Sequence, residues 1–126
     1  MLKKGRLFGI YVLLLLAGCA SSNSAESQEQ WTPNYVNVEY RADPVDIAAP
    51  YFEPLGRSDS SVVKGAWFDS ENEYLVINLQ GIVYHYCGIG SSTWSSLKSA
   101  ESMGSYFQNS IKGNFDCRVF PVPVYP

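Results

Sequence analysis

The sequence predicts a small α+β domain, an antiparallel β-meander packed against a C-terminal helical segment. Two observations support this prediction. Apolar runs of strand length, separated by short turns, fill residues 62–87, and apolar side chains recur three to four residues apart from residue 92 onward. A chain of 126 residues offers material for one core and not for two.

The strands are expected at residues 62–68, 74–79 and 82–87, with Gln80 and Gly81 as a two-residue turn between the last two. The register of this hairpin pairs Leu79 with Ile82 and gives one apolar face. That face holds Leu75, Ile77, Leu79, Ile82, Tyr84 and Tyr86. The opposite face is mixed, so we expect it to be only partly covered and to be the functional surface: Tyr74, Val76, Asn78, Val83, His85 and Cys87.

The helical segment follows two glycines, and Ser92 is expected to cap its first helix. Trp94 and Leu97 should face the sheet because they lie on one side of such a helix. Gly104 is expected to interrupt or bend the path, and Gly113 to end it. A second apolar patch lies between these glycines: Tyr106, Phe107 and Ile111.

Residues 1–18 resemble the signal peptide of a bacterial lipoprotein. Three basic residues precede an apolar run of ten, 7–16, which is about half the length that a transmembrane helix needs. Residues 16–19, Leu-Ala-Gly-Cys, fit a lipobox, so Cys19 is the predicted site of lipid attachment. Membrane anchoring through this lipid is expected in the cell envelope, and Ala20 and Ser21 favour the outer membrane facing the periplasm. An ordinary secretory signal is the alternative.

Three further segments differ in composition from the predicted domain. Residues 19–30 are mainly small and polar and indicate a flexible tether. Residues 31–57 form an irregular Pro-rich segment in which only 35–41 alternates like a strand. Residues 119–126 contain three prolines and indicate an extended tail.

Charge and cysteine content restrict the classes of partner. Removal of residues 1–18 leaves six of the nine basic residues against twelve acidic ones, a net charge of −6, which disfavours nucleic acid. With Cys19 assigned to the lipid, Cys87 and Cys117 remain and are expected to form a disulfide in an oxidising compartment. Two buried free thiols are the alternative. We expect no metal site, because only His85 could join them.

An ordered series of short motifs between residues 60 and 115 resembles the KTSC domain, a family named for the C-terminal region of some lysyl-tRNA synthetases. The series comprises Ser60 and Ser61, the strand 74–79, Gly81, Tyr84-His85-Tyr86, Ala100, Ser102, Gly104, Tyr106, Phe107 and Ile111. The resemblance implies a β-meander packed by a helical segment, here a KTSC-like domain over residues 58–118. It implies little about activity: the family has no established catalytic residues, and its suggested role in RNA binding rests on the synthetase association and conflicts with a secreted acidic chain. The family's common Val-Pro pair after the Tyr-x-Tyr motif is absent, and residues 87–90 read Cys-Gly-Ile-Gly.

The predicted function is a non-enzymatic, lipid-anchored module that binds an envelope protein or a cell-wall component, without a cofactor. Tyr74 and His85 are the candidate ligand-binding residues on the mixed face. A small envelope hydrolase or thiol enzyme is one alternative, since His85 lies close to Cys87, but no orienting carboxylate is identifiable and no catalytic residue is assigned. An RNA-binding module, as suggested for the family, is the other alternative.

Overall fold

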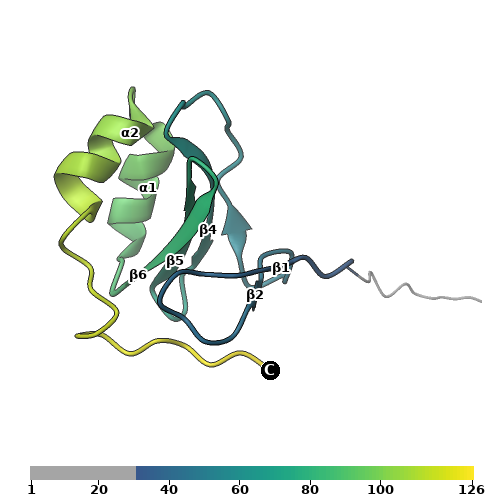
Figure 1. The fold of residues 1–126 in the computed structure, drawn as a ribbon. Helices are drawn as coiled ribbons and strands as arrows, with labels where there is room; N and C mark the ends of the chain where they lie inside the picture. The colour runs from purple at the N-terminus through teal and green to yellow at the C-terminus, as the bar shows by residue number, and fades with distance from the viewer. Residues whose placement is uncertain (1–30) are drawn as a thin grey trace, which may run out of the picture. The chain divides into compact units, whose positions relative to one another are not determined.

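The computed structural model describes residues 31–126, so the predicted signal peptide, Cys19 and the tether lie outside the described residues. It has an α+β architecture, as predicted (Figure 1). Its strands are β1 (Tyr35–Val36), β2 (Val45–Asp46), β3 (Glu53–Pro54), β4 (Val63–Asp69), β5 (Tyr74–Leu79) and β6 (Ile82–Cys87), and its helices are α1 (Ser91–Ser99), α2 (Met103–Tyr106) and the π-helix η2 (Phe107–Ile111). Between residues 31 and 126, no helix has the length and apolarity needed to cross a membrane.

The main sheet is antiparallel, with the strand order β3-β4-β5-β6, and β1 and β2 form a separate two-stranded ladder. The predicted register of the β5–β6 hairpin is confirmed, with Leu79 opposite Ile82 and Leu75 opposite Tyr86. Gln80 and Gly81 both have positive φ, 56° and 104°, as a type I′ turn requires. Because β6 is the last strand in the order, it is an edge strand of the sheet.

One face of the sheet packs against the helices, as predicted (Figure 1). Trp94 and Leu97 are buried there, and the Trp94 ring stacks on Phe68 with the ring centroids 5.2 Å apart. Phe107 and Ile111 of η2 complete the same core. This face is the apolar one identified from the hairpin register.

The opposite face is also covered, and the prediction that it is only partly covered is wrong for half of its residues. Tyr74, Val76 and Cys87 are at most 1% exposed. The apolar residues that cover them come from the N-terminal segment and the tail: Val38, Val45, Ile47, Ala49, Phe52 and Tyr125. The main sheet is the middle of three layers, with the helices on one face and the Pro-rich segment on the other. The residues that the Pro-rich segment contributes to the second core follow neither a helical nor a strand period.

The N-terminal segment and the helices differ in detail from the expected boundaries. The strand expected over 35–41 ends at Val36, because the chain turns at Tyr40, whose φ is 68°. Gly90, not Ser92, occupies the N-cap of α1. The helical path breaks between α1 and α2 rather than at Gly104, which lies inside α2 where an added Cβ would meet Val62 at 3.3 Å.

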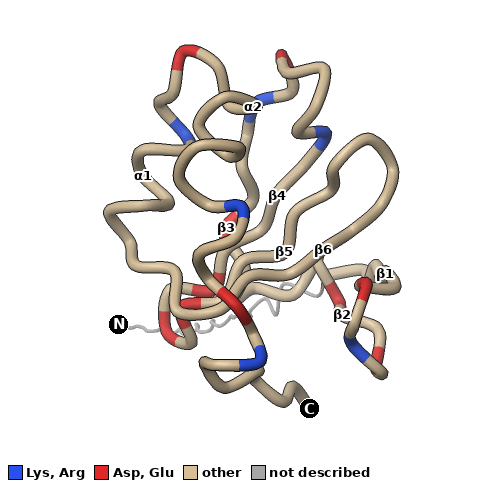
Figure 2. The backbone as a smooth tube through the Cα atoms, turned by 60° about the vertical axis from the view of Figure 1, so that its left-hand side comes forward, with Lys and Arg blue, Asp and Glu red and all other residues tan. Residues whose placement is uncertain are grey.

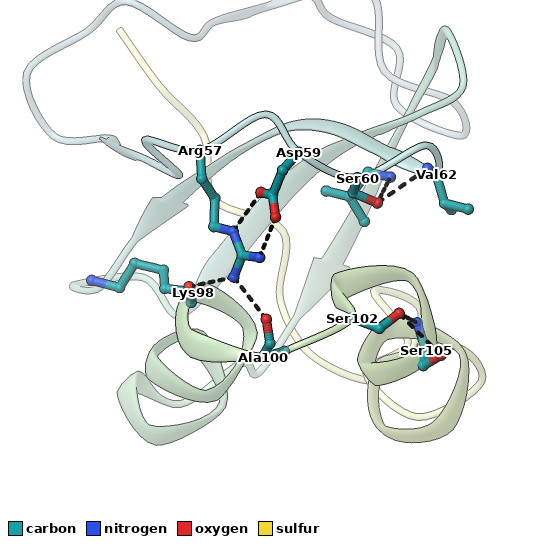
Figure 3. A network of polar contacts seen from close by, with 9 residues as sticks. Arg57, Asp59, Ser60, Val62, Lys98, Ala100, Ser102 and Ser105 are labelled. Carbon is teal, nitrogen blue, oxygen red and sulfur yellow. Dashed lines mark hydrogen bonds and ion pairs between the residues drawn. The ribbon is translucent and has the colours of Figure 1, made fainter.

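Arg57 joins the end of α1 to the segment that precedes β4 (Figure 3). Its guanidinium donates to the carbonyl oxygens of Lys98, at 2.9 Å, and Ala100, at 2.8 Å. These carbonyls have no partner within the helix, so the cation stabilises the helix C-terminus. The same guanidinium makes two bonds to Asp59 and lowers the pKa of this carboxyl to about 2.

Candidate functional site

The C-terminal tail is held against the sheet at three points. The predicted disulfide between Cys87 and Cys117 joins it to the end of β6. Arg41 donates to the carbonyl oxygen of Pro123 at 3.0 Å. The hydroxyl of Tyr125 donates to the buried carboxylate of Asp69 at 2.7 Å, and burial followed by this bond raises the pKa of Tyr125. Residues 121–126 have no regular secondary structure, and Tyr125 forms part of the second core.

A groove of about 570 Å³ lies at the outer edge of β6, and we refer to it as the edge groove. Tyr84, His85 and Tyr86 form its wall on the strand side. Residues 113–118 and Val122 form the opposite wall, and Tyr40 also lines it. Its volume lies within the range of about 300–1,000 Å³ that is typical of small-molecule sites.

His85 lines the edge groove and contacts Tyr74 of the second core, which in turn is bonded to Arg41. The Tyr74 hydroxyl lies 2.7 Å from His85 Nδ1 and accepts a bond from Arg41 at 3.3 Å. Arg41 can only donate, so the hydroxyl accepts from it and is free to donate its own hydrogen to Nδ1. In that tautomer the ring carries an Nε2–H donor. Burial, followed by the charge of Arg41, lowers the pKa of His85 and keeps the ring neutral.

Tyr74 was predicted as a second ligand-binding residue, but its ring is fully buried in the second core. The prediction of an exposed mixed face is therefore wrong at this position, because the N-terminal segment and tail cover it. The structure does bring Tyr74 and His85 together, through the contact between the Tyr74 hydroxyl and His85 Nδ1.

The outer edge of β6 is paired at two positions and open between them. Val83 accepts a backbone bond from Glu39 at 2.8 Å, and Cys87 donates one to Phe115 at 3.0 Å. The hairpin ladder alternates, so the N–H and C=O of His85 point the same way, away from β5. Among residues 31–126, these two groups of His85 have no hydrogen-bond partner.

Tyr40 was not identified from the sequence. Its side chain is 88% exposed, yet its φ of 68° is a left-handed conformation that costs a bulky residue about 1–2 kcal/mol. Neither burial nor backbone preference accounts for a tyrosine at this position. The sequence carries no signal for this residue, because the conformation depends on how the segment before β2 turns over β6.

The groove carries no net charge at neutral pH. Its charged lining residues, Asp116 and Arg118, form an ion pair at 2.8 Å. Figure 2 shows basic residues dispersed along the described chain rather than gathered on one face. Within the same residues, no group of three or more His, Cys, Asp or Glu side chains could hold a metal ion.

Comparison with known proteins identifies the domain that carries the strand-side wall. Residues 59–115 match the family model of the KTSC domain. A crystal structure of a KTSC domain protein from Yersinia pestis is 30% identical, with a TM-score of 0.47, over 52% of this chain and 92% of that chain. The search of curated proteins found no match. Tyr40, Arg118 and Val122 lie outside the matched residues, so the edge groove combines the shared domain with flanking segments.

Proposed function

The chain belongs to the KTSC domain family through residues 59–115, and we propose that this domain serves here as a lipid-anchored binding module of the cell envelope. The edge groove is its binding site, and the partner is an envelope protein or a cell-wall component. The groove is the observation that carries the proposal, because it is an open site of ligand size with a neutral, aromatic lining.

The sequence around Cys19 supports the anchor. A basic start, an apolar run of ten residues and the sequence Leu-Ala-Gly-Cys occur in the order that lipid attachment requires. Several acyl chains, at about 0.8 kcal/mol for each buried CH₂, suffice for stable attachment. The residues that follow Cys19 favour the periplasmic side of the outer membrane.

The chemistry of the groove favours binding over turnover. Cys87, the thiol closest to His85 in the strand, is bonded to Cys117 and has no thiolate with which to attack a substrate. The partner of His85 Nδ1 is the phenol of Tyr74, which lacks the negative charge that stabilises an imidazolium in a catalytic triad. A small hydrolase or thiol enzyme therefore has less support than a binding module.

Two experiments test this proposal. Labelled palmitate should enter the wild-type chain and not Cys19→Ser, and equal labelling of both would exclude the anchor. A photo-crosslinking amino acid placed at Tyr40 in intact envelopes should give an adduct, whereas the same group at Tyr35 should not. Tyr35 is a matched control because it is an exposed tyrosine outside the groove. Identical adducts at both positions would show that the groove is not the binding site.

A further inference from the structure

Resting on this proposed function, we propose that the edge groove binds a neutral oligosaccharide of N-acetylated amino sugars. Two features of the groove lead to this ligand class. Three tyrosines line it: Tyr40, Tyr84 and Tyr86. The backbone of His85 offers one N–H and one C=O at the edge of β6 that have no partner among residues 31–126. An N-acetyl group carries the complementary pair, one C=O and one N–H, on a sugar ring of suitable size.

The aromatic lining suits a sugar ring. Tyr84 and Tyr86 line the groove from the strand side and are partly buried, and Tyr40 lines it and is 88% exposed. The C–H faces of a pyranose pack on such rings, and phenolic hydroxyls beside them can bond its hydroxyl groups. Among the described residues, the hydroxyls of Tyr84 and Tyr86 have no protein partner.

The charge balance of the groove excludes strongly charged ligands. Burial lowers the pKa of His85, which favours the uncharged ring, and the charged lining residues Asp116 and Arg118 pair with each other. A phosphate or a carboxylate would find no unpaired cation there, and an ammonium group would find no unpaired carboxylate. The ligand that fits is polar and uncharged.

The same edge disfavours an extended peptide. A peptide that adds a strand to β6 needs a continuous row of backbone partners. Glu39 and Phe115 already pair with Val83 and Cys87, so the open stretch at His85 accommodates a single amide. An acetamido group matches this stretch, whereas an added strand would have to displace one of the two internal contacts.

Tyr40 provides an independent reason to assign the groove to a ligand. A strained backbone that persists without a packing benefit is typical of functional positions. The exposed ring at this strained position lies at the groove, on a segment outside the KTSC match. This arrangement makes Tyr40 the residue whose loss should most weaken binding without disturbing the core.

The test is calorimetric titration of the detergent-solubilised full-length protein with the trimer of N-acetylglucosamine. The matched ligand is cellotriose, which has the same ring and linkage without acetamido groups. We expect the trimer to bind and cellotriose to bind about tenfold or more weakly, because two backbone bonds are lost. Competition by purified cell-wall glycan or by outer-membrane polysaccharide would identify which of these envelope polymers supplies the sugar.

Tyr40→Ala should raise Kd about fivefold to tenfold, and Tyr35→Ala should leave it unchanged. Tyr40→Gly, which removes both the ring and the strain, should lose the same affinity while remaining folded. Equal affinity for the two sugars, or no binding of the trimer, would overturn the sugar assignment. If the sugar assignment fails but photo-crosslinking still gives an adduct at position 40 and not at position 35, the proposed binding module stands. Failure of both the titration and the crosslinking would overturn the binding module as well.

Discussion

Removal of the disulfide should lower the free energy of unfolding by an amount that follows from its position in the chain. Cys87 and Cys117 are 30 residues apart. In the chain-entropy model, a closed loop of this length stabilises the native state by about 3.6 kcal/mol at 25 °C. The double variant Cys87→Ala, Cys117→Ala should therefore be less stable than the oxidised wild type by about that amount.

Urea unfolding of both proteins, followed by circular dichroism, measures this difference. With a slope of about 1.5 kcal/mol per molar urea, the midpoint should fall by about 2.4 M. The slope itself should rise, because the unfolded chain without the cross-link exposes more surface. A loss below about 1 kcal/mol would refute the loop-closure reasoning for this bond. Such a result would mean that contacts of the tail and helices already restrict the unfolded chain.

Three further predictions concern single side chains. Arg57→Ala should lower the midpoint of thermal unfolding, because two carbonyls and a carboxylate lose a charged donor, and an unchanged midpoint would contradict this role. Arg118→Ala, at an exposed ion pair, should lower the midpoint less. Tyr125→Phe removes the hydroxyl bonded to Asp69 and should speed proteolysis of the tail, and an unchanged rate would contradict a role for this bond. Burial and Arg41 lower the pKa of His85 below its ordinary 6.5. The unfolded state then binds more protons than the folded state just below pH 6.5, so the free energy of unfolding should fall as the pH drops through that value. Urea midpoints measured from about pH 7 to about pH 5 should show this decrease in the wild type and not in His85→Gln.

The parts of the fold that the sequence predicted depend on local signals. The β5–β6 hairpin follows from alternation and from a turn that glycine favours, and its register is confirmed. The disulfide and the burial of Trp94 and Leu97 were also predicted correctly. The hairpin and the helix face are determined by residues close in sequence. The disulfide was predicted because only two cysteines remain once Cys19 is assigned to the lipid.

The parts that were missed depend on contacts between distant segments. Val38 and Phe52 lie in a Pro-rich segment without periodicity, so their place in a second core could not be read from the sequence. Tyr74 was assigned to an open face because most of the residues that cover it belong to this segment. His85, predicted as a ligand-binding residue, lines the edge groove, and its role stays a prediction. Tyr40 was not identified, because its position depends on the path of a loop over another strand.

The position of β5 determines how the protein can exchange its amide hydrogens with solvent. This strand lies between β4 and β6, and Tyr74 to Ile77 are fully buried from both faces of the sheet. Its amides should exchange only when the whole domain unfolds, so their rates would report global stability. The amide of His85, which points away from β5, should exchange through local motion. Exchange rates in β5 would thus report the stability of the whole domain, and the rate at His85 in β6 would report local motion at the edge groove.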